Sequence, residues 1–174
     1  ARLVRDEANG DDREDQVVYR SGLRYVPRLT PAVPTTSGAT LSADTSHLVI
    51  GATGHLGPHI IRQLAAMGAG TVVAVSRNPG EAMKELAAQL EASGSRLVQV
   101  AADATDEAEM AALFDRFGAD LPPLEGIYLA AFAGGPVTLT QMTDADVTTM
   151  FRPKLDALRV LHDLSLTSNV RHFL

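Results

Sequence analysis

A short apolar run followed by evenly spaced glycines constrains this chain more than any other feature. Residues 48–50 are Leu, Val and Ile, a run typical of a strand in a parallel sheet that is covered on both faces. Apolar positions then repeat with helical spacing up to Gly68. Between the two lie three glycines at intervals of three residues: Gly51, Gly54 and Gly57. Such glycines let the backbone turn tightly and approach a pyrophosphate, while the helix N-terminus directs free N–H groups at its charge.

The neighbouring sequence separates this interpretation from a glycine-rich loop that binds nothing. A second apolar run at 71–75 begins about twenty residues after Gly51. Together the strand, loop, helix and second strand form a βαβ unit, for which a parallel crossover is strongly favoured. The segment 48–75 therefore predicts the start of a nucleotide-binding sheet.

Strands and helices alternate along the rest of the chain. Further strands are predicted at 96–102, 126–132 and 170–174, with helices after Gly80, from Asp103 to Gly118 and over 143–165. Thr143 to Asp146 resembles a capping box, and Pro153 marks a helix start that Leu155, Leu158, Leu161 and Leu164 continue. The pattern predicts a doubly wound parallel α/β sheet, Rossmann-like, truncated after the start of its fifth strand.

The first forty residues are organised differently. Residues 1–16 are polar, with a turn predicted at 9–12. Two β-rich runs within 17–29 flank Ser21-Gly22 and predict a hairpin. The Pro, Ser and Thr content of 30–43 is typical of a linker. We therefore divide the chain into 1–41, the end of a structural subdomain plus linker, and 42–174, a nucleotide-binding subdomain.

Composition excludes several function classes. The chain has 174 residues, 45% of them hydrophobic, which is enough for a packed core. Its net charge of −6 argues against a nucleic-acid partner, and no apolar run is long enough to span a membrane. There is no cysteine, and His55 and His59 lack a third neighbouring ligand, so no metal site is predicted. A cytoplasmic setting is the default expectation.

The end of the second strand bears on cofactor choice. In NAD-binding versions of this fold an acid there bonds the ribose 2′-OH, whereas an arginine accommodates a 2′-phosphate. Here the strand ends in Ser76-Arg77, without an acid before Glu81, which favours NADP. An exposed loop cation is the alternative for Arg77. Asp103 ends the third strand beside the expected adenine pocket, or else caps the following helix.

Lys154 is a candidate catalytic residue. It is predicted in the first turn of a helix, where a cation opposes the macrodipole. It shares a stripe with Leu158 and Leu161 and so is expected to lie toward the apolar side. A solvated lysine is the alternative. The functional interpretation is a lysine that reaches the cofactor ribose and lowers the pKa of a neighbouring phenol.

From residue 47 onward the chain resembles the catalytic part of a ketoreductase domain of a type I polyketide synthase. These domains belong to the short-chain dehydrogenase/reductase superfamily. Residues 17–29 similarly resemble the strand segment that closes the smaller structural subdomain of such synthases. The matching segments, in order, are 51–57, 75–77, 102–104 and 151–155.

The resemblance implies NADPH-dependent reduction of a β-ketoacyl thioester, carried on an acyl carrier protein, to a β-hydroxyacyl thioester. It also implies the other domains of the same synthase as partners. A tyrosine would give the proton, a serine would hold the substrate oxygen, and Lys154 would tune the tyrosine. The implied cofactor-binding residues are Gly51, Thr53, Gly54, His55, Leu56, Gly57, Ser76, Arg77, Asp103, Ala104, Ala130 and Ala131.

The chain departs from the family pattern in two places. Phe132 stands where the family usually has a glycine beside the nicotinamide, which would narrow the pocket. The Leu-Asp-Asp signature of one stereochemical class is missing, since residues 134–136 are Gly-Gly-Pro, which argues against that class.

The serine and tyrosine are expected after the fifth strand, beyond Leu174. No tyrosine present, that is Tyr19, Tyr25 or Tyr128, has the family's context. We therefore expect a fragment of a reductase, poorly soluble when made alone because apolar helix surfaces over 143–165 lack cover. The alternatives are a noncatalytic structural domain and an NADP-binding sensor or epimerase-like protein.

Overall fold

The computed structural model describes residues 2–10, 12–32 and 40–174. The chain divides into two compact units, Ala1–Ser37 and Gly38–Leu174. In the described residues no helix combines the length and apolar character needed to cross a bilayer.

The N-terminal unit contains the predicted hairpin. Strands β1 (Val18–Arg20) and β2 (Leu23–Tyr25) pair antiparallel across a turn in which both Ser21 (φ 50°) and Gly22 (φ 79°) have positive φ. Positive φ at both central residues is the geometry that matches the twist of a two-residue hairpin.

A helix that the sequence did not predict, α1 (Arg2–Ala8), precedes the hairpin. Arg24 donates to both carboxylate oxygens of Glu7, and the Tyr19 hydroxyl donates to the same group at 2.7 Å. The hydrogen bond from Arg24 is the main cause that lowers the pKa of Glu7 to about 2. Of the predicted turn at 9–12 and linker at 30–43, Asp11 and residues 33–39 lie outside the described residues.

The C-terminal unit is a parallel sheet with strand order β5-β4-β3-β6-β7. This confirms the predicted doubly wound parallel α/β class. The strands are β3 (Ser46–Ile50), β4 (Thr71–Ser76), β5 (Arg96–Ala101), β6 (Leu124–Leu129) and β7 (His172–Phe173).

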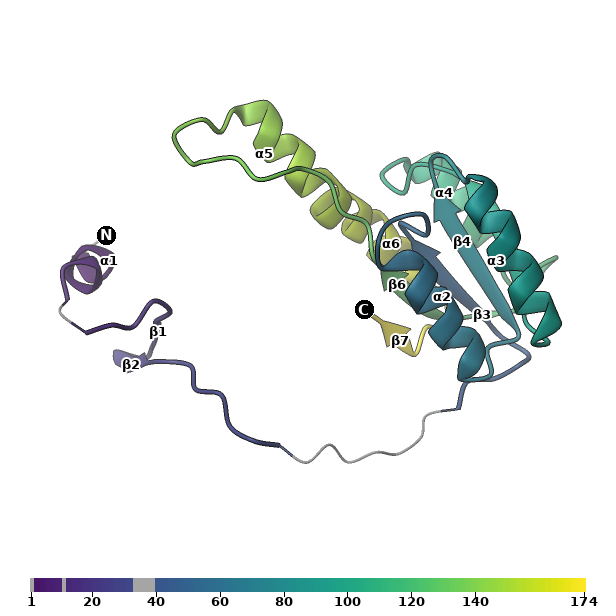
Figure 1. The fold of residues 1–174 in the computed structure, drawn as a ribbon, viewed down its shortest axis with the longest axis horizontal. Coiled ribbons are helices and arrows are strands. Elements are labelled where there is room, and N and C mark those ends of the chain that lie inside the picture. The colour runs from purple at the N-terminus through teal and green to yellow at the C-terminus, as the bar shows by residue number, and fades with distance from the viewer. Residues whose placement is uncertain (1, 11, 33–39) are drawn as a thin grey trace. The chain divides into compact units, whose positions relative to one another are not determined.

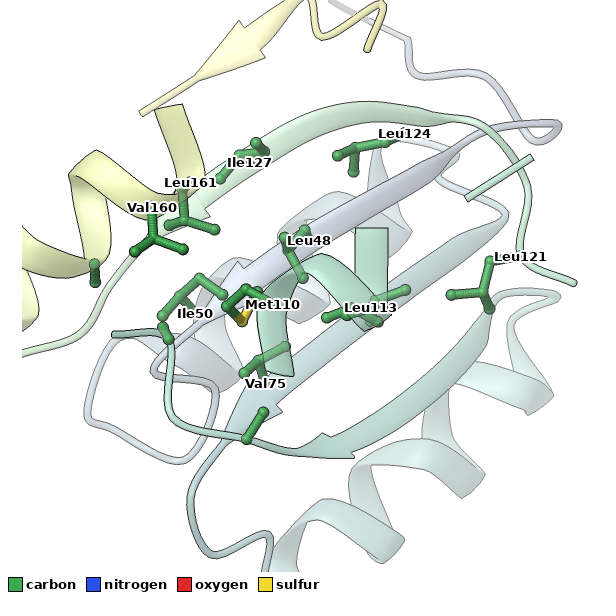
Figure 2. Packing of buried hydrophobic residues seen from close by; sticks show 14 residues of the cluster. Leu48, Ile50, Val75, Met110, Leu113, Leu121, Leu124, Ile127, Val160 and Leu161 are labelled. Atoms are coloured by element: carbon green, nitrogen blue, oxygen red, sulfur yellow. The ribbon is translucent and has the colours of Figure 1, made fainter. Parts of the chain in front are cut away.

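Helices cover both faces of this sheet (Figure 1). One face packs against α2 (Gly57–Ala66) and α3 (Glu81–Ala92), with Ile61, Leu64, Met83 and Leu86 buried. The other packs against α4 (Glu107–Phe114) and α6 (Ala157–Ser165). Figure 2 shows this second cluster, in which Leu48 and Ile50 of β3 meet Met110 of α4 and Leu161 of α6. Burial on both faces explains the continuous apolar runs of β3 and β4.

The last helical segment is not the helix that the sequence predicted. Helix α5 (Asp144–Phe151) runs into a π-helical turn, η1 (Arg152–Asp156), and then into α6. The capping box at Thr143 and Asp146 is confirmed and begins α5. Pro153 is the second residue of the π turn, but this turn continues α5, so Pro153 does not begin a separate helix as predicted. Proline lacks an N–H and disrupts the regular helical ladder, which is a recognised cause of such irregular turns.

The π turn also changes which side chains face the core. The backbone N–H of Ala157 donates to Arg152 O, five residues back, so one extra residue enters the turn. Of the predicted stripe, Leu155 and Leu158 are 54% and 40% exposed, whereas Leu161 is buried and Leu164 packs partly buried against the core. The buried residues of α6 are Ala157, Val160 and Leu161.

Candidate functional site

The glycine-rich loop is attached to the sheet by its own backbone. The N–H groups of Gly51 and Ala52 both donate to Val75 O at the end of β4, at 3.0 and 3.1 Å. The Gly54 N–H donates to Gly51 O at 2.9 Å. Helix α2 then begins at Gly57 without a side-chain cap on its N-terminus. Pro58 has no N–H, and the N–H groups of His59 and Ile60 donate to Leu56 O at 3.1 and 3.0 Å, which leaves Gly57 as the residue of this first turn that can offer an N–H to a ligand.

Gly51 must be glycine for two independent reasons. Its φ is +80°, a left-handed conformation that disfavours a side chain. A Cβ built on it would also lie 2.7 Å from the backbone N and Cα of Ala131. The end of β6 is held close to the loop, since the Ala130 N–H donates to Ile50 O at 2.9 Å. The loop and the end of β6 thus pack backbone against backbone.

The loop lies where the strand order reverses. Strand β3 has β4 on one side and β6 on the other, and the carboxyl ends of parallel strands meet at one edge. The structure brings every predicted cofactor residue to this edge: Gly51, Thr53, Gly54, His55, Leu56 and Gly57 after β3, Ser76 and Arg77 at β4, Asp103 and Ala104 after β5, and Ala130 and Ala131 after β6. Residues 53–56 are exposed along it.

Ser76 and Arg77 differ in their surroundings. The Ser76 side chain is buried, and its Oγ has no hydrogen-bond partner among the described residues. A buried hydroxyl without a partner is costly unless a ligand or water satisfies it. Arg77 beside it is exposed. The pair offers a hydroxyl and a cation at the position where the sequence predicts the 2′-phosphate.

Asp103 follows β5, which ends at Ala101, and is not a helix cap. The Asp106 carboxylate caps α4 instead, accepting from the N–H groups of Ala108 and Glu109 at 3.0 Å. Asp103 Oδ1 accepts from the N–H of Thr105 at 3.0 Å and from its hydroxyl at 2.8 Å. The Thr105 N–H bond is the main cause that lowers the pKa of Asp103, so this carboxyl is held ionised.

Lys154 lies in the π turn and is exposed, which corrects its predicted place in the first turn of a helix on the apolar side. Its Nζ donates to Met150 O at 2.9 Å and lies 4.5 Å from the centre of the Phe132 ring. Phe132 follows β6 directly after Ala130 and Ala131 and is 74% exposed. The contact places Lys154 beside the carboxyl edge of the sheet, a cation–π pair that the sequence did not predict.

Arg152 is a second residue whose contacts the sequence did not predict. Its Nη2 lies 3.1 Å from Asp103 Oδ2, and its Nε and Nη2 donate to the Thr105 hydroxyl at 3.0 and 2.7 Å. Residue 152 belongs to the segment 151–155 that resembles the family, but no sequence signal links it to Asp103, which is distant along the chain.

A separate polar cluster lies at the opposite end of the sheet, near the starts of β3 and β6. His47 is fully buried, with Nε2 3.8 Å from Glu125 Oε2 and Nδ1 3.5 Å from the Tyr128 hydroxyl. Thr45 donates to the same Glu125 oxygen at 2.6 Å. Tyr128 is therefore engaged away from the carboxyl edge.

No cluster of His, Cys, Asp or Glu suited to a metal ion occurs within the described ranges 2–10, 12–32 and 40–174.

Comparisons of the sequence with known proteins agree on one family. The profile of the KR domain family matches residues 45–174. One subunit of the phenolphthiocerol/phthiocerol polyketide synthase of Mycobacterium bovis is 65% identical over 172 residues, which cover 99% of this chain and 11% of that protein. The corresponding protein of Mycobacterium tuberculosis H37Rv is 64% identical with the same coverage. The chain thus spans about a tenth of the length of these synthase proteins.

The fold agrees with solved ketoreductases. A structure of A-type ketoreductases from a modular polyketide synthase superposes with a TM-score of 0.77 at 33% identity, covering 96% of this chain and 36% of that one. The structure of an A1-type ketoreductase superposes with a TM-score of 0.78 at 32% identity. The match covers 96% of this chain and 35% of that one. The glycine loop at the switch point, the family profile and these relatives agree, and the chain belongs to the ketoreductase (KR) domain family of type I polyketide synthases.

Proposed function

We propose that this chain is the cofactor-binding portion of an NADPH-dependent ketoreductase. In the synthase that contains it, the domain reduces a β-ketoacyl thioester on an acyl carrier protein to the β-hydroxyacyl thioester. The observation that carries the proposal is the close backbone approach of Gly51 to Ala131, which shapes a side-chain-free cradle at the switch point of the sheet.

The residues at this edge fit a dinucleotide. The loop 51–57, with the Gly57 N–H at the N-terminus of α2, would hold the pyrophosphate. The buried Ser76 hydroxyl and the Arg77 guanidinium would bind the 2′-phosphate, which satisfies the otherwise unpartnered Ser76 Oγ. Asp103 and Ala104 would line the adenine pocket, while Ala130 and Ala131 would border the nicotinamide half.

The chain's own catalytic contribution is assigned to Lys154. When bound, the dinucleotide supplies the hydride that adds to the β-carbon of the substrate. The ketone oxygen takes up a proton, and the family pattern places the tyrosine that donates it, with its serine partner, after the fifth strand. A lysine ammonium beside that tyrosine favours the phenolate and so lowers the phenol's pKa toward the working pH.

The experiment that tests the proposal measures cofactor preference in the synthase. The purified synthase is given a β-ketoacyl thioester with either NADPH or NADH, and oxidation of each is followed by absorbance. The parent protein should prefer NADPH. Since a hydrogen bond to a charged group contributes about 1.5–3 kcal/mol, Arg77→Ala should reduce that preference by about tenfold or more. The matched control is Arg96→Ala, an exposed arginine at the start of β5, away from the carboxyl edge.

Two outcomes would decide against parts of the proposal. Equal use of NADPH and NADH by the parent would contradict the assignment of Ser76 and Arg77 to a 2′-phosphate. Binding of NADPH without any reduction would indicate the noncatalytic alternative, a structural domain that keeps the cofactor cradle.

A further inference from the structure

We propose that Arg152 is a positioning residue that links the nucleotide pocket to Lys154. The inference rests on the proposed function and concerns how the two halves of that site are held together. Arg152 lies on the π turn, two residues before Lys154, while its partners Asp103 and Thr105 follow β5.

The link is a connected set of hydrogen bonds. The Arg152 guanidinium uses Nε and Nη2 on the Thr105 hydroxyl, at 3.0 and 2.7 Å, and Nη2 also lies 3.1 Å from Asp103 Oδ2. The Thr105 hydroxyl donates in turn to Asp103 Oδ1 at 2.8 Å. Three side chains therefore form one unit, and the positive charge of Arg152 adds to the causes that lower the pKa of Asp103.

The π turn needs such a link because core packing does not hold it. None of its residues, Arg152 to Asp156, all of them described, is buried. The first buried residue after it is Ala157. Lys154 itself is held by Met150 O and the exposed Phe132 ring. Arg152 is thus the point at which this turn is fixed to the loop after β5.

Because Asp103 borders the adenine pocket, a nucleotide that orders the loop 103–105 also orders Arg152 and, through the turn, Lys154. Loss of the guanidinium should leave the glycine loop intact but release Lys154 from its position. The effect should therefore appear in turnover and its pH dependence more than in fold stability.

Lysine should replace Arg152 poorly. The guanidinium presents Nε and Nη2 in a fixed fork and reaches two partners at once, whereas an ammonium is a single point charge on a flexible stem. Arg152→Lys keeps the charge but loses the fork. Thr105→Val keeps the volume of Thr105 but removes the hydroxyl that joins the other two side chains.

The experiment uses the synthase with NADPH and a β-ketoacyl thioester as substrates. It compares kcat, KM for NADPH and the pH profile of kcat for Arg152→Ala, Arg152→Lys, Thr105→Val and the Arg152→Ala/Thr105→Val double variant. The control is Arg159→Ala, an exposed arginine on α6 outside this set of hydrogen bonds. Thermal unfolding of each variant is measured alongside.

We expect Arg152→Ala to lower kcat about tenfold or more, with its pH profile shifted upward because a displaced Lys154 no longer lowers the tyrosine pKa. Arg152→Lys should fall between Arg152→Ala and the parent. The double variant should be no worse than Arg152→Ala, since both substitutions break one unit. Arg159→Ala should behave as the parent.

The outcomes distinguish failure of the positioning role from failure of the proposed function. If the parent neither binds nor oxidises NADPH, the proposed function fails. If the parent is active and Arg152→Ala matches Arg159→Ala in kcat and pH profile, the positioning role fails while the proposed function stands. A uniform loss of activity with lowered thermal stability and an unshifted pH profile in Arg152→Lys and Thr105→Val would show a purely structural role and would also overturn the inference.

Discussion

The glycine loop and the π turn border the same edge of the sheet but are held there by different means. The loop is fixed by backbone hydrogen bonds from Gly51 and Ala52 to β4, and by close backbone packing against the end of β6. The strands beneath it are buried on both faces. The π turn has no buried residue and is fixed by the exposed side chains of Arg152 and Lys154.

The difference suggests a division of tasks between the two regions. A cradle made of backbone is preorganised and tolerates most changes of neighbouring side chains, but it tolerates no added atom. A segment held by a few exposed polar contacts is weakly determined, because such contacts are screened by solvent. Substitutions should therefore affect the loop through sterics and stability, and the π turn through turnover.

The largest effect is expected at Lys154. In the synthase, Lys154→Ala should lower kcat by about 10²–10⁴-fold, the usual contribution of acid–base assistance. The matched variant Lys84→Ala removes an exposed lysine that pairs with Glu81 on α3, and it should leave kcat unchanged. Thermal unfolding should be nearly equal in both variants. A Lys154→Ala protein with parental kcat would show that Lys154 is a solvated helix residue and that the π turn has no catalytic part.

The sequence predicted the loop well because its causes are local. The apolar runs at 48–50 and 71–75 indicate strands that are buried on two faces. The spacing of the glycines indicates a turn that needs their backbone freedom. The parallel crossover between the first two strands, and the place of Ser76 and Arg77 at the end of the second, follow from the alternation of elements. These inferences need no knowledge of contacts between distant residues.

The π turn could not be predicted in the same way. Pro153 was interpreted as a helix start because proline is common there, yet the capping box ten residues earlier already begins the helix. One extra residue in the turn shifts Leu155 relative to Leu161, so Leu155 leaves the expected stripe and is 54% exposed. The bond between Arg152 and Asp103 joins residues 49 apart in the chain, so it emerges only when the fold brings them together.

The second prediction tests whether close packing, and not φ alone, fixes the loop. Gly51→Ala adds a Cβ against Ala131 at φ +80°, whereas Gly94→Ala adds one at φ +87° with nothing within 4 Å. Both should lose about 1–2 kcal/mol to left-handed strain. Gly51→Ala should lose a further 1–3 kcal/mol, roughly, to overpacking and should bind NADPH much more weakly. Equal destabilisation of the two variants, measured by denaturant unfolding, would show that the backbone approach does not matter.

The smallest effect is expected at the opposite end of the sheet, near the starts of β3 and β6. There a change of pH should alter the stability of the fold without altering the glycine loop or the π turn. Burial lowers the pKa of His47, and the neighbouring Glu125 carboxylate only partly opposes this. The unfolded chain therefore binds a proton at His47 more readily than the folded chain does. Stability from neutral His47 is fully present above its unfolded pKa of about 6.5 and declines as the pH falls below that value.

Glu125 contributes in a lower pH window, which separates the two groups. The hydrogen bond from Thr45 lowers the pKa of Glu125, so its stabilising effect is lost only as the pH falls below the ordinary carboxyl range. The Tm of the ketoreductase domain should therefore fall between about pH 7 and pH 5 through His47. His47→Gln should flatten this slope, and His59→Gln, at an exposed position on α2, should leave it unchanged. A slope that is the same in all three proteins would show that His47 is not the group that titrates, and that the buried cluster is insensitive to acid in this range.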